Sequence, residues 1–195
     1  MTSNSPNVVV IAGPNGSGKS TAAPTLLRDY LGLVEFVNAD VIAQGLSGFG
    51  SEQVSLQAGR IMLKRLTDLA TRQADFAFET TLASRSFAPR LRQLQADGYR
   101  VHLLFLWLPS PEMAIARVAS RVQRGGHHVP DEVVRRRYDA GLTNFFSMYR
   151  PFVDEWRIFD NSDGGGYEQI AQESRTGELQ IENTAVWQRI EEQYQ

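Results

Sequence analysis

The sequence predicts an α/β domain in which helices flank a largely parallel β-sheet. Two observations support this prediction. Short segments rich in β-branched and aromatic residues alternate with helical segments, as in proteins whose parallel strands are joined by right-handed helical crossovers. A glycine-rich turn also joins the first of these strands to the first helix. The chain has 195 residues with no internal repeat or low-complexity segment, so we expect one domain over residues 1–195.

The elements expected in the first half follow from apolar runs and their flanking residues. Residues 7–12 are almost uniformly apolar, which is typical of a strand covered on both faces, and residues 19–30 follow as a helix that contains Pro24. Residues 35–38 and 76–79 are two further short strands. A loop and then a helix over residues 52–73 are expected between them. The loop glycines and the capping serine are Gly45, Gly48, Gly50 and Ser51.

The second half repeats this alternation. Gly98 ends one helix, and Ser110 with Pro111 supplies a cap and a first-turn proline for the next. The expected elements are a helix at 86–96, a strand at 99–108, helices at 111–123 and 131–148, a strand at 156–159, and a helical tail at about 167–195 with its helix near 184–193.

Composition narrows the class of protein. Hydrophobic residues make up 42% of the chain and charged residues 22%, as in ordinary globular proteins. A formal charge of -2 gives no general attraction to nucleic acid or to a membrane surface. The absence of cysteine excludes disulfides, thiolate chemistry and cysteine zinc sites. No apolar run is long enough to span a membrane or to form a signal peptide, so we expect a cytoplasmic protein.

A phosphate-binding loop follows the first strand, where eight residues match the pattern G-x-x-x-x-G-K-[ST]. Its glycines let backbone N–H groups converge on phosphate oxygens, and the following helix adds its positive end. Lys19 is expected to neutralise the β- and γ-phosphates, and the Ser20 hydroxyl to coordinate Mg²⁺. A chance glycine-rich turn would not require a buried strand before it and a helix after it. We therefore predict nucleoside triphosphate binding by Gly13, Pro14, Asn15, Gly16, Ser17, Gly18, Lys19, Ser20 and Thr21.

Two carboxylates follow predicted strands, at the sheet edge where α/β proteins bind ligands. Asp40 is a candidate general base for an acceptor hydroxyl, or alternatively an N-cap of a following helix. Glu79 is a candidate for ordering Mg²⁺ or holding substrate, with a solvated strand end as the alternative. Thr81 could donate to the substrate or simply cap a turn.

An arginine-rich segment is a candidate lid over residues 117–137, where two helices meet at a Gly-Gly-His-His loop. Guanidinium groups suit the planar charge that develops in phosphoryl transfer. The alternative is a basic solvated face or a nucleic-acid patch. His127 and His128 are expected in the hinge, with metal binding as the less favoured role. The arginines are Arg117, Arg121, Arg124, Arg135, Arg136 and Arg137.

Four segments give the chain a resemblance to the zeta-toxin-like P-loop kinases over residues 7–162. They are Asn38-Ala39-Asp40, the Phe-Glu-Thr-Thr-Leu segment at 78–82, the Arg-Val-Gln-Arg-Gly-Gly-His segment at 121–127, and the Arg-Arg-Arg-Tyr segment at 135–138. The resemblance implies a three-layer, adenylate-kinase-like P-loop NTPase fold with a five-stranded parallel sheet in the order 2-3-1-4-5. Founding members of that family use ATP and Mg²⁺ to phosphorylate a hydroxyl of UDP-N-acetylglucosamine. They carry an arginine where this chain has Ala83.

Carried over to this chain, the resemblance implies a role for each matching residue. Lys19 and Ser20 take the phosphate and metal roles, and Asp40 stands beside the acceptor hydroxyl as the base. Glu79 and Thr81 bind the substrate. Stabilisation of the transferred group falls to arginines among Arg121, Arg124 and Arg137.

The leading hypothesis is therefore an ATP- and Mg²⁺-dependent kinase acting on a hydroxyl of a small molecule, which is expected between Asp40, Glu79 and the helix over residues 52–73. A separate antitoxin chain is a partner that the resemblance allows. An ATP-dependent switch that phosphorylates nothing is the rival hypothesis. A nucleic-acid 5'-kinase is a third, which the mildly acidic composition disfavours. Asp160, Asn161 and Ser162 form either part of an adenine site or an ordinary turn.

Overall fold

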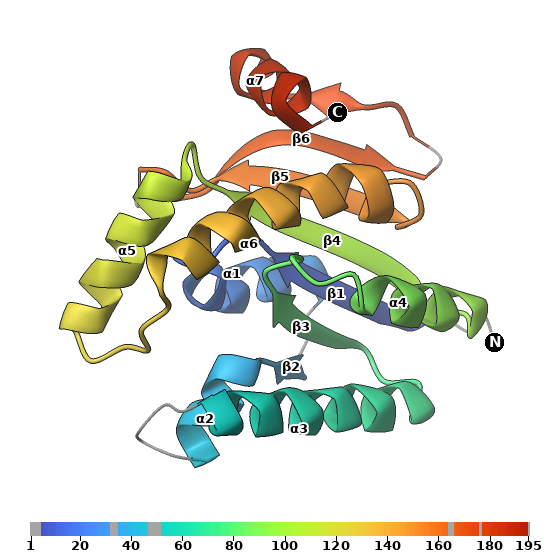
Figure 1. The fold of residues 1–195 in the computed structure, drawn as a ribbon. Helices are drawn as coiled ribbons and strands as arrows, with labels where there is room; N and C mark the ends of the chain where they lie inside the picture. Colours follow the sequence, from blue (N-terminus) through green and yellow to red (C-terminus); the bar gives the residue numbers. More distant parts are fainter. Residues whose placement is uncertain (1–4, 32–34, 47–51, 164–165, 176, 195) are drawn as a thin grey trace.

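A seven-stranded sheet in the order β2-β3-β1-β4-β5-β6-β7 forms the centre of the protein (Figure 1). The computed structural model describes residues 5–31, 35–46, 52–163, 166–175 and 177–194. The strands are β1 (Asn7–Ala12), β2 (Phe36–Val37), β3 (Phe76–Thr80), β4 (Arg100–Trp107), β5 (Glu155–Asp160), β6 (Glu168–Ser174) and β7 (Gln180–Ile181). The helices are α1 (Lys19–Leu31), α2 (Ala39–Leu46), α3 (Glu52–Thr71), α4 (Phe87–Ala96), α5 (Pro111–Gln123), α6 (Asp131–Asn144), the π-helix η1 (Phe145–Tyr149) and α7 (Thr184–Tyr194).

The predicted parallel core is confirmed, because strands β1 to β5 pair in parallel in the order 2-3-1-4-5. The helical tail predicted at about 167–195 is helical only in its last part, where α7 (Thr184–Tyr194) matches the helix expected near 184–193. Strands β6 and β7 extend the sheet antiparallel beyond β5, and only α7 is helical there. In β6 only Ile170 and Ala171 are buried, so the segment has neither an apolar run nor a clear alternation. Pairing with β5, rather than a local sequence signal, makes it a strand.

Three local predictions need correction. A helix, α2, begins at Ala39, and its cap is Asn38, whose Oδ1 accepts the backbone N–H groups of Asp40 at 2.8 Å and Val41 at 3.3 Å. Asp40 therefore lies in the first turn and is not the N-cap. Gly45 belongs to this helix and not to a loop, while Gly48, Gly50 and Ser51 lie outside the described residues. The helix predicted at 131–148 ends at Asn144 and continues as the π-helix η1.

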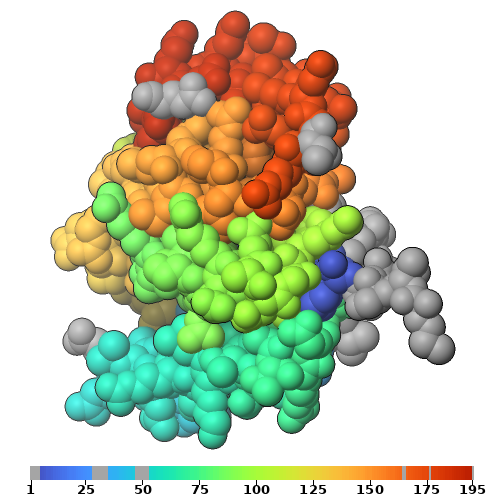
Figure 2. Space-filling view, turned by 90° about the vertical axis from the view of Figure 1, so that its right-hand side faces the viewer, coloured from blue at the N-terminus to red at the C-terminus, as the bar shows by residue number. Residues whose placement is uncertain are grey.

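The two faces of the sheet carry different helices. Alternate residues of β1 point to opposite faces, so Val9 and Ile11 pack against α1, and Val8 and Val10 against the larger cluster on the other face. That cluster includes residues of α3, α4, α5, α6 and α7. Seen from the side in Figure 2, α3, α4 and the C-terminal third lie in successive bands. The carboxyl ends of β1, β2 and β3 consequently open onto one edge, between α3 and the α5–α6 pair (Figure 1).

Candidate functional site

The phosphate-binding loop is a buried turn between β1 and α1. Asn15, Ser17 and Lys19 are all less than a tenth exposed. Gly16 has a φ of +81°, and a Cβ there would lie 2.6 Å from the carbonyl oxygen of Ala114. A glycine is needed at this position because helix α5 packs directly on the loop. Helix α5 and the phosphate loop are thus one packed unit.

Lys19 lies at the centre of the site. Its Nζ donates to the carbonyl oxygen of Pro14 at 2.8 Å and lies 3.7 Å from Glu79 Oε1. Burial lowers the pKa of Lys19 below its ordinary value, and the carboxylates of Glu79 and Asp40 oppose that shift. The ammonium group is therefore held in place, at low solvent exposure, beside two carboxylates. A polyphosphate would bring further negative charge to the same point.

Ser20, Glu79 and Asn38 form an oxygen-rich cluster next to Lys19. The Ser20 hydroxyl donates to Glu79 Oε2 at 2.7 Å, and Asn38 Nδ2 donates to the same two oxygens at 3.2 and 2.6 Å. Neighbouring ligands of an octahedral Mg²⁺ at about 2.1 Å lie about 3 Å apart, so a hydroxyl and a carboxylate oxygen in this arrangement fit the ion. The described residues hold no cluster of three or more histidine, aspartate or glutamate side chains suited to a metal. One carboxylate with a hydroxyl is an ordinary Mg²⁺ site where phosphates supply further ligands.

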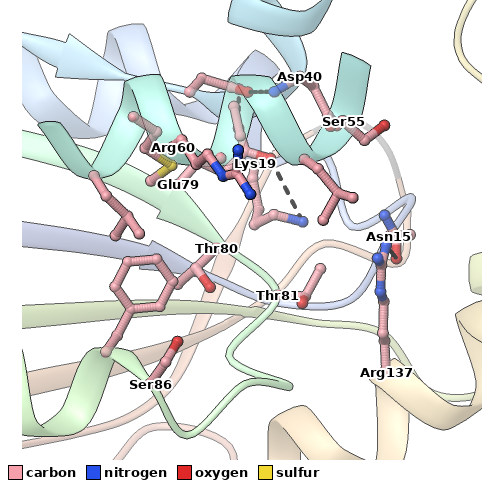
Figure 3. A pocket seen from close by; sticks show the side chains of 17 residues that line it. Asn15, Lys19, Asp40, Ser55, Arg60, Glu79, Thr80, Thr81, Ser86 and Arg137 are labelled. Atoms are coloured by element: carbon pink, nitrogen blue, oxygen red, sulfur yellow. Dashed lines mark hydrogen bonds and ion pairs between the residues drawn. The ribbon is translucent and has the colours of Figure 1, made fainter. Parts of the chain in front are cut away.

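Two cavities open on either side of these residues. The first, which we call the loop cavity, has a volume of about 600 Å³ and lies between the phosphate loop and α5. The second, the α3 cavity, has a volume of about 440 Å³ and lies between α2, α3 and the segment after β3 (Figure 3). Both are lined by the same four residues, Asn15, Lys19, Asp40 and Glu79. The two cavities therefore meet at the end of the phosphate loop.

The predicted lid arginines divide between these cavities. Arg117, Arg121 and Arg124 line the loop cavity from α5. Arg121 donates to the carbonyl oxygen of His127 at 2.8 Å, and its Nε is buried with no hydrogen-bond partner among the described residues. Arg137 lines the α3 cavity instead, and its guanidinium donates to Asn15 Oδ1 at 3.3 Å (Figure 3). Burial lowers the pKa of Arg137, and Asp40 opposes the shift.

Other members of the basic segment do not face these cavities. Arg135 pairs with Glu112, and Arg135 and Arg136 line neither cavity. His102 contacts Glu155 at 3.2 Å and Asn7 at 3.0 Å within the sheet, which is consistent with a structural role.

The turn after β5 supports the phosphate loop. Asn161 Nδ2 donates to the carbonyl oxygen of Ser17 at 2.8 Å, and Arg117 donates to the carbonyl oxygen of Ser162 at 2.5 Å. Asp160 Oδ1 accepts the N–H of Ser162 at 2.8 Å, so the segment is a side-chain-closed turn.

The α3 cavity contains residues that the sequence analysis did not single out. Thr80 and Thr81 both line it, and the Thr80 hydroxyl also accepts the N–H of Leu82 at 3.1 Å. The missed residues are Ser55, Leu56, Gly59, Arg60, Met62, Leu63, Ser86 and Phe87. A signal for part of this set existed, since Ser55, Gly59 and Met62 follow the spacing i, i+4, i+7 of one helix face. It could not be distinguished from the pattern of an ordinary surface helix.

A phosphate loop between β1 and α1, on a parallel sheet in the order 2-3-1-4-5, defines the P-loop kinase fold. Comparison with known proteins identifies the family within this fold. The zeta toxin family matches residues 1–167, and the chain belongs to that family. An uncharacterized protein of Haemophilus influenzae is 28% identical over 130 residues, which cover 67% of this chain and 91% of that protein.

Solved structures show the same fold at lower identity. A chain in the AvrRxo1-ORF1:AvrRxo1-ORF2 crystal structure with sulphate ions superimposes with a TM-score of 0.78 at 20% identity, covering 96% of this chain. This chain spans 64% of its length. A putative kinase from Chloroflexus aurantiacus has a TM-score of 0.64 at 16% identity, covering 98% and 100% of the two chains. A chain of the PezAT chromosomal toxin-antitoxin system of Streptococcus pneumoniae has a TM-score of 0.62 at 15% identity. The match covers 99% of this chain and 87% of that one.

Among the described residues, no helix is both long and apolar enough to cross a bilayer.

Proposed function

We propose that this protein is an ATP- and Mg²⁺-dependent kinase that transfers the γ-phosphoryl group to a hydroxyl of a small molecule. The observation that carries the proposal is the shared wall of the two cavities. Asn15, Lys19, Asp40 and Glu79 line both, so a donor in the loop cavity and an acceptor in the α3 cavity would meet at these side chains. A switch that only hydrolyses ATP has no need of a second cavity of about 440 Å³ at this point.

Each residue then has a definite task. Backbone N–H groups of the phosphate loop bind the polyphosphate, and Lys19 offsets its charge. The Asp40 carboxylate accepts the proton of the acceptor hydroxyl as its oxygen bonds to the γ-phosphorus, while the bond from that phosphorus to the β,γ-bridging oxygen breaks and ADP leaves. Ser20 and Glu79 would hold Mg²⁺, which would supply further charge compensation to the phosphate oxygens. The chain's contribution is mainly positioning and electrostatic.

The arginines act from both sides of the transferred group. Arg121 and Arg124 approach from the loop cavity and Arg137 from the α3 cavity. Planar guanidinium groups can each donate two hydrogen bonds to phosphoryl oxygens. Closing of the turn after α5, where Gly125 and Gly126 line the loop cavity, would also exclude water and so favour transfer over hydrolysis.

The acceptor side favours a polar metabolite. Ser55, Thr81, Ser86 and Arg60 line the α3 cavity together with the apolar Leu56. A nucleotide sugar such as UDP-N-acetylglucosamine is the first acceptor to test, because of the resemblance to the zeta-toxin-like kinases. By the same resemblance we propose a cytoplasmic site of action and an antitoxin, encoded as a separate chain, as a partner.

Incubation with γ-labelled ATP, Mg²⁺ and a metabolite extract tests the proposal. Label in a new organic phosphate is the expected result, and UDP-N-acetylglucosamine alone is the first single acceptor to try. Label that appears only in inorganic phosphate would identify the ATP-dependent switch instead. Label on the 5' end of an added oligonucleotide, with none in small molecules, would identify a nucleic-acid kinase.

A further inference from the structure

The segment after β3 has an unusual backbone conformation. We call residues 80–86 the acceptor loop, because Thr80, Thr81 and Ser86 line the α3 cavity. Leu82, in the middle of the loop, is fully buried and has a φ of +60°. A residue with a Cβ adopts this left-handed conformation only when its surroundings enforce it.

Helix α6 supplies the enforcing contacts. Asn144 is 4% exposed, and its Nδ2 donates to the carbonyl oxygen of Leu82 at 2.9 Å and to that of Ala83 at 3.2 Å. On the other side, the Thr80 hydroxyl accepts the N–H of Leu82 at 3.1 Å. Both backbone polar groups of Leu82 are therefore satisfied in the strained conformation and would lose these partners in a relaxed one.

A glycine brings the helix close enough for these bonds. A Cβ on Gly141 would lie 2.6 Å from the carbonyl oxygen of Thr81, so α6 contacts the acceptor loop backbone directly. Arg137, Gly141 and Asn144 follow the spacing i, i+4, i+7 and share one face of α6. That face therefore reaches both the phosphate loop, through the Arg137 to Asn15 bond, and the acceptor loop.

The π-helix η1 adds one more contact to the same loop. Tyr149 is buried, and its hydroxyl donates to the carbonyl oxygen of Ser84 at 3.0 Å. Residues five apart lie about 140° apart around an α-helix, but on roughly the same side of a π-helix, in which hydrogen bonds join residues five apart. The switch to π-geometry after Asn144 thus lets Asn144 and Tyr149 address one loop.

We propose that Asn144 is a positioning residue for the acceptor substrate. By holding Leu82 in the left-handed conformation it fixes Thr81 and Ser86 in the wall of the α3 cavity. Asn144 lines neither cavity, so it acts only through the loop. The inference rests on the proposed function in one respect, that the α3 cavity binds the acceptor.

Two variants remove the contacts separately. Asn144→Leu keeps the approximate shape of the side chain and deletes both hydrogen bonds, while Tyr149→Phe deletes only the bond to Ser84. Asn183→Ala is the matched control, because Asn183 caps α7 by accepting the N–H of Val186 at 3.1 Å, far along the chain from the acceptor loop. Thermal unfolding of the three variants identifies any general loss of stability.

The first measurement does not depend on enzyme activity. Arg85 lies exposed within the acceptor loop, so trypsin can cut the chain after it once the loop opens. We expect the rate of this cut, followed by mass spectrometry, to rise roughly tenfold in Asn144→Leu and severalfold in Tyr149→Phe, since each lost hydrogen bond contributes modestly to closing the loop. Asn183→Ala should leave the rate at its wild-type value.

The second measurement uses the acceptor that the wild type labels. Asn144→Leu should raise the KM for that acceptor roughly tenfold and leave the affinity for ATP unchanged. Wild-type cleavage after Arg85 together with a wild-type KM would overturn the inference, as would an equal loss of ATP affinity. If the wild type labels no acceptor at all, the proposed function fails, and the cleavage rate alone decides: faster cleavage supports the positioning of the loop by Asn144, and unchanged cleavage refutes it.

Discussion

The loop cavity and the α3 cavity share a wall but are built in different ways. One wall of the loop cavity comes from a single short segment, in which Asn15, Gly16, Gly18, Lys19, Ser20 and Thr21 line the cavity. The α3 cavity is assembled from side chains of α2, α3, the acceptor loop and α6, which are far apart in the sequence. A polyphosphate can be recognised by a local backbone motif. Recognition of a particular acceptor requires side chains that only the complete fold brings together.

Substitution of Lys19, which lines both cavities, should have the largest effect and should reduce both ATP binding and phosphoryl transfer. Lys19→Ala removes the buried ammonium group from the shared wall, so we expect at least about a 10³-fold loss of transfer and a severe loss of ATP affinity. Calorimetry with ATP and Mg²⁺, alongside the labelling assay, measures the two losses. Lys64→Ala, on α3 and outside both cavities, is the control. Retention of ATP affinity in Lys19→Ala would remove the phosphate loop from its assigned role.

Substitution of Asp40 should reduce phosphoryl transfer without reducing ATP binding. Asp40→Asn keeps the shape of the side chain but not its basicity, so transfer should fall about 10²- to 10³-fold while ATP binding is retained. The same calorimetric and labelling measurements apply. If ATP affinity falls as much as it does in Lys19→Ala, Asp40 serves the nucleotide and cannot be the base.

The arginines should show a graded effect. Arg121→Ala removes a guanidinium from the loop cavity, and we expect transfer to slow by about 10- to 100-fold. Arg135→Ala is a matched control on the neighbouring helix, because Arg135 pairs with Glu112 and lines neither cavity. An exposed ion pair of this kind contributes little to stability, so its loss should leave turnover nearly unchanged. Equal effects of the two substitutions would mean that the basic segment acts only through its overall charge.

Substitution of a glycine in α3 should have the smallest effect, and it should change only the binding of the acceptor. In the described part of the chain, nothing lies within 4 Å of a Cβ placed on Gly59, which lines the α3 cavity, so the side chain of Gly59→Leu would extend into the cavity without a clash. We expect a roughly tenfold rise in acceptor KM with normal ATP binding. Gly45→Leu is the control, since Gly45 also lies in a helix, has no described residue within 4 Å of its Cβ position, and lines neither cavity. Unchanged acceptor kinetics in Gly59→Leu would place the acceptor elsewhere.

The same contrast explains how much the sequence could predict. The strands of the parallel core and the phosphate loop depend on local patterns, an apolar run and a spaced set of glycines, and both are found where they were expected. The role of Asn38 as a helix cap also followed local chemistry, but the adjacent Asp40 was an equally good candidate from the sequence alone.

The features that were missed depend on contacts between distant segments. Strand β6 is polar and exists because β5 offers it a pairing edge. The left-handed Leu82 has no local signal, since leucine rarely adopts a positive φ and the responsible group, Asn144, comes 62 residues later. For a similar reason, the sequence could not predict which arginines line which cavity. Helical spacing shows which residues share a helix face, but it does not show which cavity that face borders.

The family match ends at residue 167, yet the hydrophobic interior continues past it. Trp187 of α7 stacks on Trp156 of β5 with ring centres 5.6 Å apart, and the guanidinium of Arg150 lies 5.1 and 5.5 Å from the two rings. A polypeptide shortened to the matched residues would leave Trp156 uncovered and the outer side of β5 without its neighbour β6. Exposed strand edges of this kind recruit other chains, so such a fragment should precipitate on expression even though it retains every residue that lines the two cavities.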